Sequence, residues 1–163
     1  NNSKKDIVGR VVLHPWDFLY FGGSFRYGYP SYLNDKDSRT TIGGELKLKY
    51  RGFTLLGEYI MDEGDYNRDL GGGCSGNLIE LGEERSGGYV TMAYMTKWNV
   101  EPVFMIDFFD SGNASGYKEN NMTFGLNYFF NDWTRLQLNY VYRAESPSEI
   151  RNDEFVVQVQ VKF

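Results

Sequence analysis

The sequence predicts an all-β protein of the antiparallel transmembrane β-barrel class, with residues 1–163 forming a single domain. Apolar and polar residues alternate with period two along nine stretches, and this period places successive side chains on opposite faces of a strand. Aromatic residues make up 17% of the chain, with 13 Tyr and 12 Phe against 4 Pro, which favours strands over helices. The connections alternate between short turns and long polar loops, as they do in transmembrane barrels.

The alternation is clearest in residues 39–50, where Glu45, Lys47 and Lys49 alternate with Leu46 and Leu48. The last two stretches repeat this pattern on either side of a polar break, which predicts an antiparallel hairpin. In chain order, we expect strands at residues 7–13, 18–28, 39–50, 54–61, 87–96, 100–110, 121–130, 134–143 and 155–163.

Short connections are expected around Pro15, Gly52, Trp98 and Asp132, and long polar ones around Leu33, Cys74, Ala114 and Pro147. We expect Pro15 to end the hydrogen bonding of the first strand, because proline has no N–H. Aromatic residues flank the short connections: Trp16, Phe18, Tyr50, Phe53, Trp98, Phe130 and Trp133. Aromatic side chains at one rim suit the boundary between lipid and water, so the short connections predict a membrane girdle on the periplasmic side.

The polar face of the expected strands would line the lumen of a barrel. The candidate pore-lining residues are Arg10, Arg26, Glu45, Lys47, Lys49, Glu58, Asp107, Arg135, Arg143 and Lys162. Glu101 and five amide residues share this face: Asn127, Gln137, Asn139, Gln158 and Gln160.

Two interpretations of the lumen cations stay open. Lys47 and Lys49 project from one strand face about 7 Å apart, given the rise of a strand. Neighbouring strands can align such cations into basic steps that attract small anions. Alternatively, the charges only keep a wide channel wet, with Glu45 and Glu58 balancing the cations.

The count of nine strands is odd, whereas bacterial single-chain barrels have an even number. The final residue, Phe163, is similar to the terminal Phe of bacterial outer-membrane barrels, which places the first strand's start on the outer rim. We therefore expect the chain to be the back portion of a larger barrel. The alternative is a soluble or surface β-barrel with its apolar face inward and a ligand inside, because period two does not say which face is interior. A barrel that serves only as an anchor is a third alternative.

Several stretches along consecutive hairpins resemble the phosphate-selective porin O/P family: GRVVLHP (9–15), GGEL (43–46), GEY (57–59), EPV (101–103), TFGLNY (123–128) and NDWTRLQLNY (131–140). The resemblance implies the C-terminal half of a 16-stranded outer-membrane porin that forms trimers with a basic lumen. One departure is Met105-Ile106-Asp107, where the family pattern often has Arg before Tyr-Asp. Because the lumen face also carries carboxylates, the resemblance supports a porin better than a preference for phosphate.

Composition argues against other function classes. The net charge is -5 and no basic cluster is present, so we expect no nucleic-acid partner; the expected partners are the lipid bilayer and small solutes or anions. His14 is the only histidine and Cys74 the only cysteine, so we expect neither an enzyme nor a catalytic site. The acidic stretch at residues 62–69 lacks the spacing of a calcium loop, and we expect no metal or other cofactor.

Overall fold

The computed structural model describes residues 5–29, 38–64 and 83–162. These residues form nine strands: β1 (Ile7–Trp16), β2 (Leu19–Gly28), β3 (Arg39–Tyr50), β4 (Phe53–Gly64), β5 (Glu84–Tyr94), β6 (Val100–Asp110), β7 (Lys118–Asn131), β8 (Thr134–Ser146) and β9 (Glu154–Val161). The predicted all-β fold and its nine strands are confirmed. The described part of the chain has no helix that could span a membrane. Cys74, Phe163 and the acidic residues 65–69 lie outside the described residues.

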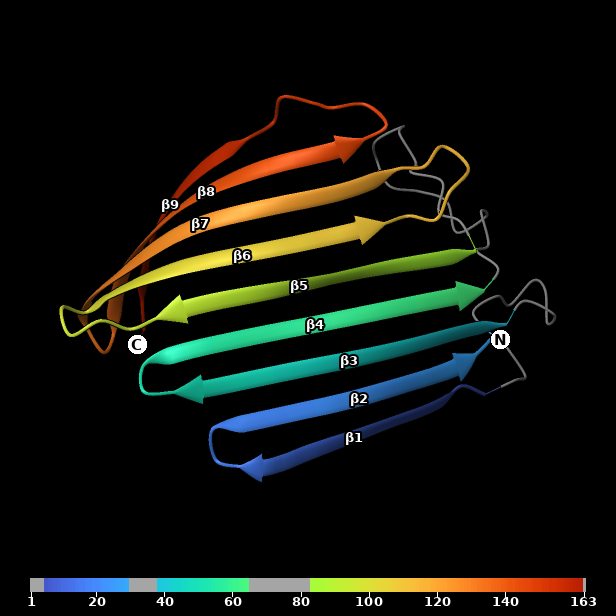
Figure 1. Ribbon diagram of the computed structural model, residues 1–163, viewed down its shortest axis with the longest axis horizontal. Coiled ribbons are helices and arrows are strands. Elements are labelled where there is room, and N and C mark those ends of the chain that lie inside the picture. The colour runs from blue at the N-terminus through green and yellow to red at the C-terminus, as the bar shows by residue number, and fades with distance from the viewer. Residues whose placement is uncertain (1–4, 30–37, 65–82, 163) are drawn as a thin grey trace.

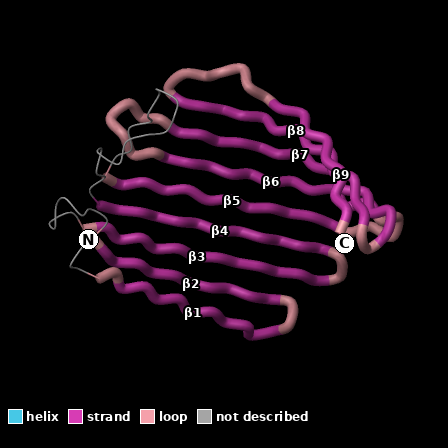
Figure 2. The backbone as a smooth tube through the Cα atoms, turned by 180° about the vertical axis from the view of Figure 1, so that it is seen from behind, coloured by secondary structure: helices cyan, strands magenta, loops and turns pink. Residues whose placement is uncertain are grey.

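The strands form one antiparallel sheet in which each strand pairs with its neighbours in sequence, in the order β1 to β9 (Figure 1). The sheet is curved, since its β8–β9 end recedes from the viewer in Figure 1 and comes forward in the reverse view of Figure 2. It is not closed: within the described residues β1 pairs only with β2, and β9 only with β8. The described residues therefore form an open, curved sheet with β1 and β9 at its two edges.

The connections separate into two rims, which lie at opposite ends of the strands (Figure 1). The short-connection rim holds the turns after β1, β3, β5 and β7, and the long-connection rim holds the connections after β2, β4, β6 and β8. The turn between β3 and β4 has only two residues, Arg51 and Gly52, with φ of 48° and 84°. Positive φ at both central positions is the geometry that joins twisted antiparallel strands most tightly. Short and long connections therefore alternate along the chain, as the sequence predicts.

Several strand ends differ from the sequence prediction, and β1 and the β4–β5 hairpin show the reasons. β1 continues through Pro15 to Trp16, with a register shift between Leu13 and Trp16. Proline is tolerated at such an irregularity because the ladder hydrogen bonds are already interrupted there. At the other rim, β4 extends to Gly64 and β5 begins at Glu84, so this hairpin is longer than the predicted strands 54–61 and 87–96.

The register assigns each strand residue to one of two faces. Glu45 of β3 pairs with Gly22 of β2 and with Glu58 of β4. The same row continues across the sheet through Tyr89, Asp107, Asn121 and Arg143. We call the face that carries this row the polar face. The opposite face, with Leu46, Tyr59, Val90, Ile106 and Phe108, is the apolar face.

Burial distinguishes the two faces. Among the described residues no large apolar side chain is buried, and those of the apolar face are open to solvent, as Val11 and Phe155 illustrate at 65% and 68% exposure. The buried side chains on the strands are instead polar: Asp62, Arg85, Asn121 and Asn127, all on the polar face. Side chains crowd together on the concave side of a curved sheet and spread apart on the convex side. The polar face is therefore the inner, concave face.

Candidate functional site

The candidate site is the polar face, on which the register places the predicted residues from Arg10 to Arg143. Lys162 directly follows β9, and its backbone N–H donates to Trp133 O at 2.7 Å. The register thus places those of the predicted residues that lie within strands on one face. What the sequence alternation left open is which of their charges are paired.

Three of the predicted cations are neutralised by carboxylates. Arg10 of β1 forms an ion pair with Glu45 of β3, and its guanidinium donates to the Tyr20 hydroxyl of β2 at 2.7 Å. This pair reaches across β2 at Gly22, where an added Cβ would lie 2.6 Å from Glu45 Oε1. A glycine at this position makes room for the link. Residues 10 and 45 are therefore joined into one local charge pair.

The other two neutralised cations lie closer to the long-connection rim. Arg26 contacts Asp6 at 2.5 Å, and Arg143 contacts Glu154 at 2.8 Å. The hydrogen bond from Arg26 holds the pKa of the Asp6 carboxyl below its usual value. A carboxylate beside each arginine interrupts the predicted row of basic steps in this part of the face.

The remaining predicted cations gather toward the short-connection rim. Lys47 and Lys49 are near the end of β3, and they form no ion pair with a residue that the structure describes. Arg135, the second residue of β8, donates to Gln160 Oε1 at 2.7 Å, a neutral partner. Lys162 follows β9 at the same rim. Positive charge that no described carboxylate pairs with is thus concentrated at one end of the polar face.

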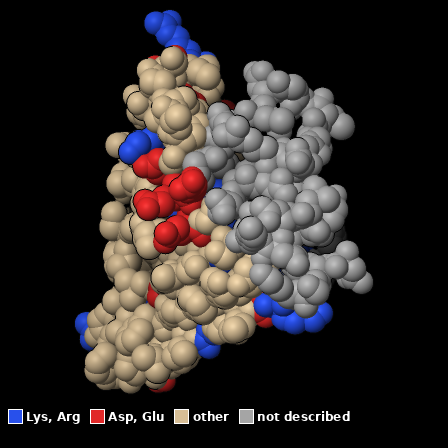
Figure 3. Space-filling view, turned by 90° about the vertical axis from the view of Figure 1, so that its right-hand side faces the viewer, with Lys and Arg blue, Asp and Glu red and all other residues tan. Residues whose placement is uncertain are grey.

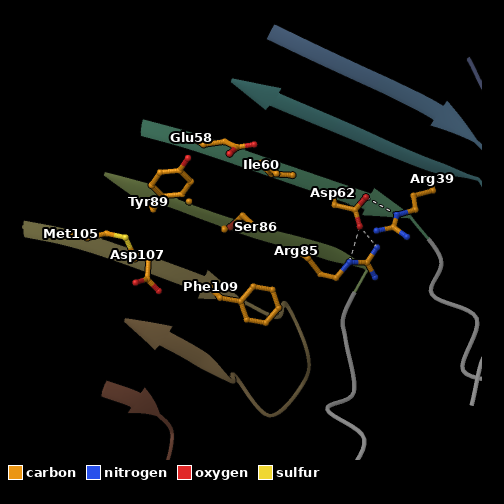
Figure 4. Close-up of a pocket in the computed structure, with 12 residues that line it drawn as sticks. Arg39, Glu58, Ile60, Asp62, Arg85, Ser86, Tyr89, Met105, Asp107 and Phe109 are labelled. Carbon is orange, nitrogen blue, oxygen red and sulfur yellow. Dashed lines mark hydrogen bonds and ion pairs between the residues drawn. The ribbon is translucent and has the colours of Figure 1, made fainter. Parts of the chain in front are cut away.

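A buried charge cluster at the opposite end was not predicted. Asp62, near the end of β4, accepts hydrogen bonds from Arg39 at 2.6 Å and Arg85 Nε at 2.9 Å (Figure 4). It also accepts one from Thr41 Oγ1 at 2.7 Å. The Asp62 and Arg85 side chains are only 9% and 5% exposed. The sequence predicts both residues in a loop, because the hydrophobic alternation ends before Asp62 and resumes only after Arg85. The opposite charges on facing strands were the available signal, but the register was needed to use it.

A hollow of about 610 Å³ lies on the polar face between this cluster and the middle of the strands (Figure 4). Ile60 and Phe109 line it from β4 and β6, and Gly87 of β5 lies between them in register. Toward the short-connection rim it is bounded by Glu58, Tyr89 and Asp107. Neither carboxylate forms an ion pair within the described part of the chain. The hollow therefore combines an apolar floor with unpaired negative charge.

Uncharged groups dominate the polar face toward β9. Asn127 Nδ2 donates to Glu101 Oε2 at 2.9 Å, and Gln137 Nε2 donates to Asn127 Oδ1 at 3.2 Å. Gln158 of β9 pairs with Gln137 of β8 in the sheet register. Nearer the hollow, Asn121 Nδ2 donates to Asp107 Oδ1 at 2.8 Å. These amides keep the surface hydrated and orient the carboxylates that they contact.

Aromatic side chains gather at the short-connection rim, as predicted. Trp16, Trp98 and Trp133 are 59%, 69% and 65% exposed. Trp16 stacks on Phe18 with ring centroids 5.9 Å apart, and Lys97 lies 5.1 Å from the Trp98 ring centroid. Exposed indole rings beside cationic groups are typical of the boundary between lipid and water.

His14 lies beside Tyr20 at the short-connection end of the sheet. Its ring packs edge-on against Tyr20, with centroids 4.9 Å apart, beside a separate hollow of about 600 Å³. No cluster of potential metal ligands occurs among residues 5–29, 38–64 and 83–162. Comparison with protein-family models, curated proteins and solved structures finds no match to this chain.

Proposed function

We propose that the chain forms part of a bacterial outer-membrane porin, a passive channel for small hydrophilic solutes. The observation that carries this proposal is the separation of the two faces. Large exposed apolar side chains cover the convex face, and charged and amide groups cover the concave face. Soluble proteins rarely expose a continuous apolar surface of this extent, whereas a membrane barrel needs one against the lipid and a wet interior.

The rim aromatics support the same assignment. Trp16, Trp98 and Trp133 lie at the end of the strands where short periplasmic turns are expected, and each is more than half exposed. The alternative, a soluble barrel with its apolar face inward, needs the opposite curvature. Partition of the protein into detergent rather than buffer is the expected result.

The open sheet favours a larger barrel. β1 and β9 run in the same direction, so further strands that close the barrel antiparallel must be odd in number. The family resemblance suggests a total of 16 strands and assembly as a homotrimer. Free edges are an aggregation hazard, which further strands would remove.

Solute preference is expected to follow the uneven charge of the polar face. Lys47 and Lys49 favour small anions such as phosphate at the short-connection end, while the carboxylates paired with Arg10, Arg26 and Arg143 oppose a strong preference along the whole channel. The mixture favours a general diffusion channel with weak anion preference.

The test is planar-bilayer conductance of the intact protein, with the reversal potential measured under a salt gradient. We expect stepwise channels, and a shift of the reversal potential toward cation preference in the double variant Lys47→Glu and Lys49→Glu. Lys97→Glu is the matched control, because Lys97 lies in the turn beside Trp98. An absence of channels would refute the proposed function, and an unchanged reversal potential would refute the role of the two lysines.

A further inference from the structure

We infer that the hollow on the polar face binds organic cations, that is, small amines with an apolar body. This inference deepens the proposed function and rests on it in taking the polar face as the channel wall. It identifies a class of solute that the basic short-connection rim does not suggest.

The shape of the hollow fits an apolar group. Its volume of about 610 Å³ is within the range of small-molecule sites. Ile60 and Phe109 lie on either side of Gly87 in register, and the glycine contributes no side chain between them. A ring or short alkyl chain can therefore rest on the backbone of β5 between two apolar side chains. Such a floor is unusual on a face that otherwise carries charges and amides.

The charges that border the hollow select a cation. Glu58, Tyr89 and Asp107 form one row across β4, β5 and β6, so the Cα atoms of the two carboxylates are roughly 10 Å apart at two strand spacings. No cation of the described residues pairs with either carboxylate. The two nearby arginines, Arg39 and Arg85, are both held by Asp62. The net charge offered to a bound solute is therefore negative.

The neighbouring Asn121 side chain has the same polarity. Asn121 is 8% exposed and donates its amide N–H to Asp107, while its own Oδ1 lacks a hydrogen-bond donor. The carboxylates at the strand ends of the long-connection rim do not face the hollow. Glu63, Glu84 and Asp110 belong in register to the convex face, and Asp110 pairs with Lys118. In Figure 3, which looks onto this rim, Asp and Glu side chains form a group on the described surface. The preference for cations therefore rests on Glu58 and Asp107, which border the hollow on the concave face.

The test uses benzylammonium as the probe, with benzyl alcohol and benzoate as its neutral and anionic analogues. Current in potassium chloride alone tests the channel, and reduction of that current by the probe tests the site. We expect benzylammonium to block at a concentration at least about tenfold lower than either analogue. Glu58→Gln and Asp107→Asn should each raise that concentration about tenfold, and Glu101→Gln, whose carboxylate is held by Asn127 outside the hollow, should not change it.

The channel and the site can fail separately. If potassium chloride gives no current, the proposed function fails, and calorimetry of the detergent-solubilised protein with the same three compounds still tests the site. Equal binding of benzylammonium and benzyl alcohol by the unmodified protein would overturn the inference without any variant. Unchanged block or binding in both Glu58→Gln and Asp107→Asn would also overturn it.

Discussion

Replacement of Asp62 by Asn tests whether the buried charge cluster holds the long-connection rim together. Asp62 Oδ1 accepts from Arg39 and Thr41, and Oδ2 accepts from Arg85, so one carboxylate links β3, β4 and β5. Asn has nearly the same shape but no charge, and its amide nitrogen cannot accept a hydrogen bond. The substitution therefore removes the negative charge that faces two guanidinium groups.

The expected loss of stability follows from burial. Removal of one partner from a buried ion pair costs about 3–5 kcal/mol, because the remaining charge stays desolvated. Arg85 is 5% exposed and fits this case, whereas Arg39 is 33% exposed and can turn toward water. We therefore expect the lower end of the range, about 3 kcal/mol, for Asp62→Asn.

Guanidinium unfolding in detergent micelles, followed by tryptophan fluorescence, measures this loss. Asp110→Asn is the matched control: Asp110 pairs with Lys118 across β6 and β7 at the same rim, but the two side chains are 34% and 53% exposed. An exposed pair contributes at most about 1 kcal/mol. Equal losses for the two variants would refute the argument that burial makes the Asp62 cluster important.

Three further predictions concern packing, pH and the membrane. Gly88→Ala should destabilise the sheet by about 1–3 kcal/mol, because its Cβ would lie 2.7 Å from Glu58 O, while Gly44→Ala, with nothing within 4 Å, should be neutral in the same unfolding assay. The lowered pKa of Asp6 means that its bond to Arg26 stabilises the fold above the usual value of 3.8 and is lost as pH falls through the lowered value. Carboxyl NMR should show this titration move up to the usual value in Arg26→Gln, and an unmoved titration would contradict the assignment. The membrane prediction uses a variant in which Trp16 and Trp133 are replaced and Trp98 is kept. Lipids brominated near the headgroup should quench the fluorescence of Trp98 more than lipids brominated near the chain end. The reverse order would contradict a rim position at the lipid boundary.

The sequence alone determined the local structure of this protein. Period-two alternation is a property of neighbouring residues, so the strand at residues 39–50 and the common face of Glu45, Lys47 and Lys49 could be read without any knowledge of the partners. The turns could be predicted for the same reason, since a turn such as Arg51-Gly52 depends on only a few consecutive residues. The difference between the short-connection rim and the long-connection rim could also be predicted, from the lengths of the connections in the sequence.

The tertiary structure decided which charges meet and where the strands end. Asp62 and Arg85 are 23 positions apart, and they become neighbours only because β4 and β5 pair in one particular register. The same is true of Arg10 and Glu45, which are joined across β2, and of the hollow between Ile60 and Phe109. Pro15 remained inside β1 because it falls in the register shift between Leu13 and Trp16, which only the pairing with β2 reveals. Local periodicity specifies the direction of each side chain, whereas pairing, burial and charge compensation depend on which strands lie side by side.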